Sequence, residues 1–164
     1  MDLQSQTSRE YIRSLILVYF GLLTGQIVFA VITFAVNKQL MEPMAEDLRV
    51  VFIYIVPVFV INGFVTGQLI YRNRLRKIKR LDTLASKLGE YKSAFMIRLA
   101  MLEGAFLFAI IIYLLTADLI FMGMSGIIIA YFLVLRPTID RISADMELNS
   151  TERMKLERED EIIT

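Results

Sequence analysis

One apolar segment, residues 94–115, constrains this chain more than any other feature, because it carries one carboxylate, Glu103, in its interior. A helix needs about 20 apolar residues to cross a bilayer, so the segment is long enough to span one. At about 1.5 Å per residue, Glu103 lies roughly 13 Å inside a hydrocarbon layer about 30 Å thick. An ionised carboxylate at that depth is costly. Glu103 must therefore be paired, protonated or turned toward a polar cavity.

Composition places the chain among membrane proteins. Hydrophobic residues make up 56% of the sequence, more than a soluble domain of this size needs. The chain has no cysteine and no histidine, which removes disulfides, thiolate metal sites, the commonest transition-metal ligand and the usual general base. It also lacks a Gly-rich phosphate loop and a close pair of carboxylates at the membrane surface. We therefore expect no enzyme, no cofactor and no metal site.

Four apolar segments are expected to cross the membrane as helices. They lie at residues 15–36, 50–71, 94–115 and 119–135. A tight turn at residues 116–118 joins the last two. The sequence thus predicts an all-α membrane protein in which residues 1–137 form a four-helix transmembrane domain of two hairpins. Residues 138–164 are expected to form a charged cytoplasmic tail, and residues 1–10 a polar tail that is disordered or lies on the surface.

The C-terminal tail carries one local signal for a helix. Asn149 is followed three residues later by Glu152, which resembles a capping box and predicts a short helix from Ser150 onward. The charges that follow alternate in sign, a pattern typical of a solvated helical face.

A dense basic block follows the second apolar segment. It contains Arg72, Arg74, Arg76, Lys77, Lys79 and Arg80. Apolar residues recur through it at helical spacing as far as Leu88, and Gly89 is a plausible end. We expect an amphipathic basic helix between spans two and three, either prolonging the second span or lying on the membrane surface. The block is an orientation signal or a specific contact for anionic lipid or a partner. Nucleic acid is not expected, because no base-reading pattern accompanies the charge.

The basic block also predicts orientation. By the positive-inside rule it lies in the cytoplasm, and both ends of the chain then fall on the same side. The two short connections, which are acidic or carry only Asp118, fall outside. Arg98 is near enough to the cytoplasmic surface to extend its charge into water.

Counting nine residues from the cytoplasmic end of each span places one polar residue per span at about one depth: Thr24, Asn62, Glu103 and Ser125. Small residues four apart accompany them in every span: Gly21, Gly25, Gly63, Gly67, Ala100, Gly104, Gly126 and Ala130. Small residues let helices approach closely in lipid, and polar side chains then bond across. We expect Glu103 to bond Asn62 and Thr24, with Gln26 and Gln68 as separate interhelical contacts. The layer is either structural or an ion or proton site.

Similarities in sequence bear on whether this polar layer is structural or an ion site. Residues 23–25 and 102–104 are similar in sequence, as expected of two related hairpins. Residues 102–108 (Leu-Glu-Gly-Ala-Phe-Leu-Phe) resemble the carboxylate motif of the duplicated proteolipid subunit of rotary ATPases, which implies that Glu103 carries a proton or sodium ion in a ring. That family places its carboxylate on the second helix of a hairpin, whereas Glu103 is on the first.

The chain also resembles small four-span bacterial membrane proteins of unassigned function, through the same Leu-Glu-Gly segment and the late Arg136-Pro137. This resemblance implies a multi-pass protein of the bacterial inner membrane. Three hypotheses follow: a structural or accessory membrane protein, an ion-translocating proteolipid-like subunit, and a membrane enzyme acting on lipid, which is the weakest because the sequence shows no catalytic constellation. The expected partners are the bilayer, anionic lipids, and a second copy or another membrane protein.

Overall fold

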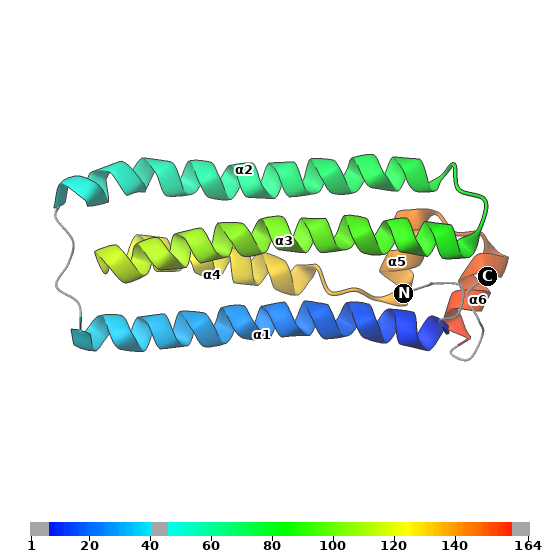
Figure 1. Cartoon of the computed structure of the whole chain (residues 1–164), viewed down its shortest axis with the longest axis horizontal. Coiled ribbons are helices and arrows are strands. Elements are labelled where there is room, and N and C mark those ends of the chain that lie inside the picture. Colours follow the sequence, from blue (N-terminus) through cyan, green and yellow to red (C-terminus); the bar gives the residue numbers. More distant parts are fainter. Residues whose placement is uncertain (1–6, 41–45, 159–164) are drawn as a thin grey trace. The chain divides into compact units, whose positions relative to one another are not determined.

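The structure is a computed structural model that describes residues 7–40 and 46–158. This part of the chain is helical and contains no strand. Its six helices are α1 (Ser8–Leu40), α2 (Glu46–Ile78), α3 (Leu84–Thr116), α4 (Leu119–Val134), α5 (Ile139–Met146) and α6 (Ser150–Glu157) (Figure 1).

Three of the helices, α1, α2 and α3, are long and apolar enough to cross a membrane, as expected of a membrane protein. Helix α4 has 16 residues and a length of about 24 Å, which is short for a hydrocarbon layer of about 30 Å. It supplies a fourth candidate span only together with α5, from which it is bent by 85°. Pro137 lies in the break between them, where its ring and missing N–H oppose a continuous helix.

Helix α1 extends further toward the N-terminus than its apolar segment. The Thr7 hydroxyl accepts a hydrogen bond from the Glu10 backbone N–H, and the Glu10 carboxylate accepts one from the Thr7 N–H. This reciprocal pair is a capping box, which satisfies two donors at a helix start. The expectation that residues 1–10 form a disordered or surface tail is therefore wrong from Ser8 onward, and residues 1–6 lie outside the described residues.

The basic block does not form a separate amphipathic helix in the described chain. Helix α2 continues to Ile78, so its basic residues as far as Lys77 prolong the second apolar helix. A turn follows, and Thr83 starts α3 by accepting a hydrogen bond from the Ser86 N–H. Leu88 therefore belongs to α3. Gly89 lies inside that helix rather than at an end, and its prediction as a stop is wrong.

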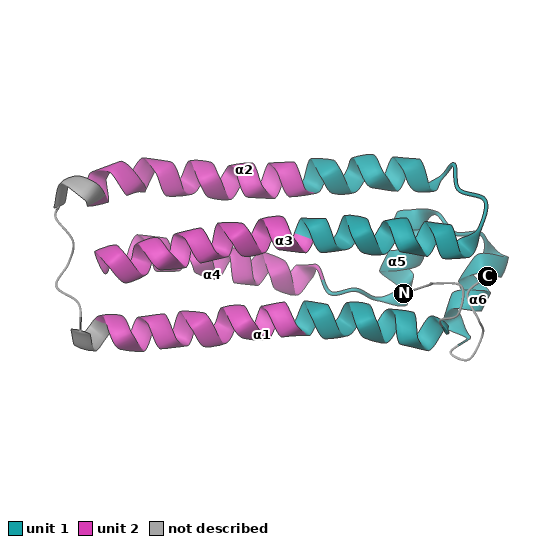
Figure 2. Ribbon diagram, in the orientation of Figure 1, with its two compact units in different colours: residues 1–20, 68–98, 136–164 teal, residues 21–67, 99–135 magenta. Residues whose placement is uncertain are grey.

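Two compact units divide the chain (Figure 2). Unit 2 comprises residues 21–67 and 99–135. Among its three long helices, α3 contributes the most to the core: half of its most apolar stretch is buried, against 28% for α1 and 17% for α2. Fully buried side chains include Phe106 and Ile110 of α3 and Phe121 and Phe132 of α4. Helix α3 is thus the element that the other helices of this unit pack against.

The end of α3 in unit 2 is capped from α1. The Asn37 side-chain amide donates hydrogen bonds to the carbonyl oxygens of Tyr113 (2.9 Å) and Leu114 (3.2 Å). These carbonyls belong to the last turn of α3, where Leu114 has no later helical N–H to accept from. The bond is therefore a side-chain cap supplied by a neighbouring helix.

The turn between α3 and α4 lies at residues 116–118, as predicted. Ala117 adopts a left-handed backbone conformation with φ 56°. Asp118 caps α4, because one carboxylate oxygen accepts from the Ile120 N–H while the other accepts from Arg49 Nε at 2.6 Å. Burial raises the pKa of this carboxyl, but the hydrogen bonds and the Arg49 charge outweigh that effect and hold its pKa below the ordinary value.

Unit 1 comprises residues 1–20, 68–98 and 136–164. Its core joins Tyr11 and Leu15 of α1 to Leu88 and Tyr91 of α3, all almost completely buried. The Tyr11 hydroxyl donates to the Leu88 carbonyl oxygen at 2.7 Å. The short helices α5 and α6 add Ile142, Met146 and Leu156 to this core. The C-terminal segment is therefore packed through apolar side chains rather than only solvated.

Candidate functional site

The polar centre of unit 2 is a side-chain pair between α1 and α3. Gln26 Nε2 donates a hydrogen bond to Glu103 Oε2 at 2.5 Å. Gln26 is completely buried, whereas Glu103 is partly exposed. The oxygen of the same amide, Gln26 Oε1, is buried and has no hydrogen-bond partner. The carboxyl group thus has a partner in its own chain, and the amide retains one unused acceptor beside it.

The sequence pattern of α1 explains why Gln26, and not Thr24, faces α3. Buried residues of this helix recur at spacings of three and four: Tyr19, Leu23, Gln26, Ala30, Thr33 and Asn37. Residues at this spacing share one helix face. Thr24 lies on a different face and is exposed. The predicted bond to Thr24 is therefore wrong, and the interhelical contact expected of Gln26 is present.

The other members of the predicted polar layer also lie apart from Glu103. Asn62 is exposed on α2, and its Oδ1 accepts from Thr66 Oγ1 of the same helix at 3.1 Å. Ser125 is buried in α4 and donates to the Phe121 carbonyl oxygen of its own helix at 3.0 Å. Equal depth in four helices does not bring four side chains together, because each also has a direction around its helix axis.

The predicted stripe of small residues marks a close helix approach in unit 2 at one glycine. A Cβ atom at Gly63 would lie 3.2 Å from both Ala105 Cβ and the Met101 carbonyl oxygen, so α2 and α3 are in close contact there. Gly67 is buried as well. The remaining positions are exposed: Gly21, Gly25, Ala100, Gly104, Gly126 and Ala130. The four glycines among these would place a Cβ in open space, so they mark no interhelical contact within the described chain.

The basic residues predicted to contact lipid fall into two groups. Two of them are engaged by the chain: Arg74 donates to Glu90 (2.9 Å) and Ser93 (3.2 Å), and Lys79 donates to Glu147 (2.7 Å). Four others are exposed: Arg72, Arg76, Lys77 and Arg80. Lys79 is exposed too but is bonded to Glu147, so these four cations are the ones most available to a lipid headgroup.

Arg98 lies inside unit 1 rather than extending into water. It is only 6% exposed, and its guanidinium carbon lies 4.7 Å from the centre of the Tyr71 ring. Such stacking on an aromatic face is favourable for arginine. The Tyr71 hydroxyl in turn donates to Asp145 of α5 at 2.6 Å. The expectation that Arg98 reaches solvent is wrong, because its side chain is buried in unit 1 against the Tyr71 ring.

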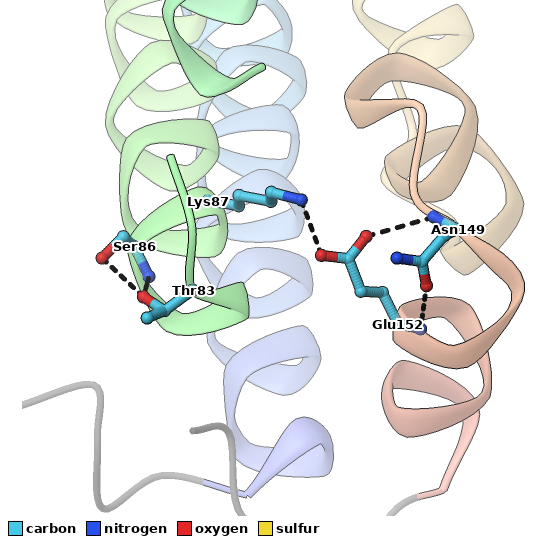
Figure 3. Close-up of polar contacts among 5 residues, drawn as sticks. All are labelled: Thr83, Ser86, Lys87, Asn149 and Glu152. Atoms are coloured by element: carbon cyan, nitrogen blue, oxygen red, sulfur yellow. Dashed lines mark hydrogen bonds and ion pairs between the residues drawn. The ribbon is translucent and has the colours of Figure 1, made fainter. Parts of the chain in front are cut away.

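An ion pair fastens α6 to the start of α3. Lys87 Nζ lies 2.6 Å from Glu152 Oε1, while the Asn149 N–H donates to the other carboxylate oxygen, and the Glu152 N–H donates to Asn149 Oδ1 (Figure 3). The predicted capping box at the start of α6 is thereby confirmed. Burial of the Glu152 carboxyl raises its pKa, but these hydrogen bonds and the Lys87 charge together hold the pKa below its ordinary value of 4.5.

Comparisons with known proteins find no match to a family model, a curated protein or a solved structure. The described residues contain no group of three or more histidine, cysteine, aspartate or glutamate side chains that could hold a metal ion. The physical features of the Gln26–Glu103 pair, the basic surface and the helix contacts therefore carry the functional argument.

Gly63→Leu should lower the thermal stability of the protein in mild detergent by about 1–3 kcal/mol, because the added side chain would push against α3. The Met101 carbonyl, one of its two nearest neighbours, is backbone and cannot turn away as a side chain would. Gly104→Leu is the matched control, since a Cβ atom at Gly104 would meet nothing within 4 Å. Equal melting temperatures for both variants would contradict the close contact between α2 and α3.

Glu152→Gln tests the docking of α6 through its pH dependence. Because the folded pKa of Glu152 is lowered, its stabilising contribution is present above the unfolded value near 4.5 and is lost as pH falls through the folded value. The variant should melt at a lower temperature than the wild type near neutral pH, and the difference should shrink as the pH falls below about 4. A difference that persists undiminished as the pH falls well below 4.5 would contradict the ionised pair.

Proposed function

We propose that this chain is a small integral membrane protein with a structural or accessory role, in which the Gln26–Glu103 pair ties α1 to α3. The observation that supports this role is the hydrogen bond that Glu103 accepts within its own chain from a completely buried amide. A carboxyl group that carried ions at the rim of a ring would have to be released from such a partner in each cycle. A permanent interhelical bond requires no such release.

The proposal includes four spans arranged as two hairpins, with both ends of the chain in the cytoplasm of a bacterial cell. The cations support this orientation. Arg9 and Arg13 precede most of the apolar part of α1, and the basic block lies at the connection between α2 and α3. The short turn after α3 carries Asp118 and no cation. Helix α4, being short, would cross with local thinning of the bilayer.

The alternative function is ion or proton translocation with Glu103 as the carrier. It is favoured by one observation, the partial exposure of Glu103, which leaves a route for a proton to reach the carboxyl. The unused Gln26 Oε1 could then accept a hydrogen bond from the protonated carboxyl after a small side-chain rotation. The two functions make opposite predictions for ion flux in Glu103→Gln, which removes the carboxyl group and leaves Gln26 in place.

Glu103→Gln should leave the melting temperature in detergent nearly unchanged, because glutamine has nearly the same size and keeps an oxygen that can accept from Gln26 Nε2. Gln26→Leu should destabilise the protein by about 1–3 kcal/mol, since it leaves Glu103 without its partner. Replacing both residues by leucine should restore most of that loss.

Proteoliposomes provide the deciding measurement for the structural role. Proton or sodium flux through the wild type that disappears in Glu103→Gln, while the variant still folds, would overturn the structural proposal in favour of translocation. The structural role would be supported by a stable Glu103→Gln variant, a destabilised Gln26→Leu variant and a double leucine variant that regains stability. Neither the wild type nor Glu103→Gln should then show flux.

We also propose that anionic lipids bind the exposed cations at the cytoplasmic end of α2. Each cation near an anionic surface contributes about 1 kcal/mol, and salt screens it. Changing Arg72, Arg76 and Lys77 together to Gln should therefore reduce the anionic lipid that co-purifies with the protein several-fold. Arg74→Gln is the control, because Arg74 is engaged by Glu90. An equal effect of the single control and the triple variant would contradict the assignment.

A further inference from the structure

Asn62 occupies an unusual place for a polar side chain. It lies 13 residues after Arg49, the start of the candidate span that ends at Ile78. This distance corresponds to about 20 Å along the helix. Its side chain is too short to reach either surface of the bilayer from there. Asn62 is nevertheless exposed rather than covered by another helix of its own unit.

The amide of Asn62 is only partly satisfied. Its Oδ1 accepts from Thr66 Oγ1 at 3.1 Å, and no hydrogen bond from its Nδ2 is present in the part of the chain that the structure describes. A primary amide has two N–H donors and two acceptor positions. Hydrocarbon tails offer no acceptor, so donors left facing lipid are costly. The position of Asn62 therefore calls for a partner within the membrane.

The surface around Asn62 is apolar and open. Together with Tyr54, Ile55, Val58 and Phe59 it lines a shallow hollow of about 500 Å³ on α2. Tyr54 is 72% exposed and Val58 66%. Helix α2 is also the least buried of the three long helices. A polar group on an apolar helix face is the arrangement that promotes association between helices in lipid.

We propose that the chain forms a two-fold dimer in which this face of α2 packs against the same face of a second copy, with Asn62 bonded to Asn62 of the partner subunit. In a two-fold interface, a residue near the axis meets its own counterpart. An amide suits that position because it offers both a donor and an acceptor, so each copy satisfies the other. A lipid headgroup cannot supply these groups, since it lies at the bilayer surface.

Thr24 on α1 is another exposed polar residue of unit 2, but it does not require a partner in the same way. A threonine hydroxyl can donate to a backbone carbonyl of its own helix, which satisfies it without a partner. The exposed Gly21 and Gly25 beside it have no polar group to satisfy. The dimer interface is therefore assigned to α2, and α1 provides a control surface. This inference is independent of the role of Glu103.

Single-cysteine crosslinking in membranes tests the dimer, because the chain contains no cysteine of its own. Val58→Cys should form a disulfide-linked dimer on mild oxidation. Val31→Cys is the control, since Val31 is similarly exposed, at 61%, but lies on α1. Crosslinking of both positions to the same extent would overturn the assignment to α2.

The role of the amide is tested in the Val58→Cys background. Asn62→Leu should weaken dimerisation about 3- to 30-fold, the range expected for interhelical hydrogen bonds in membranes. Asn62→Gln, which keeps the amide, should retain the crosslink. Because Asn62 is exposed, both variants should melt near the wild-type temperature. An unchanged crosslink in Asn62→Leu, or a particle of one copy or of more than two in mild detergent, would overturn the proposal.

Discussion

Hydrocarbon offers no hydrogen bonds, and this constraint applies to every polar side chain that a helix carries into the membrane. Serine and threonine meet it locally: Thr33, Thr116 and Ser125 donate to the carbonyl oxygen four residues earlier in their own helices. The amides meet it by reaching across, as Gln26 does to Glu103 and Asn37 does to the end of α3. Helix contacts in unit 2 are thus specified by a few amides within an otherwise apolar surface.

The helices themselves were largely predictable because their signal is strong and local. Long apolar runs predicted the positions of α1, α2, α3 and α4, and the turn at residues 116–118 follows from the charge of Asp118 between two such runs. The helix starts could equally be predicted from their capping residues. The Asn149–Glu152 box was identified, and the same reasoning applied to Thr7 and Glu10 would have placed the start of α1 correctly.

The polar site was less predictable because depth along a helix is only one of two coordinates. Glu103 was identified from its depth, but its partner depends on which way each helix faces. The pairing of Glu103 with Gln26 follows from the three- and four-residue spacing of the buried face of α1, which Thr24 does not share. The attachment of α5 and α6 could not be read from charge alternation alone, since that pattern is equally typical of a solvated face. It depends on distant residues such as Tyr71 and Lys87.

Two of the amide contacts between α1 and α3 have a joint mechanical consequence. Gln26 and Asn37 are 11 residues apart on α1, and their partners Glu103 and Leu114 are 11 apart on α3, so both pairs have the same sequence offset of 77. The two helices run parallel in unit 2, and both bonds require one axial register. Sliding α1 by a single turn would break both bonds together and leave two amides, a carboxyl group and the Leu114 carbonyl without these partners. Helix α1 is therefore held against translation along α3, and its separation from α3 in this unit would have to occur as one cooperative step.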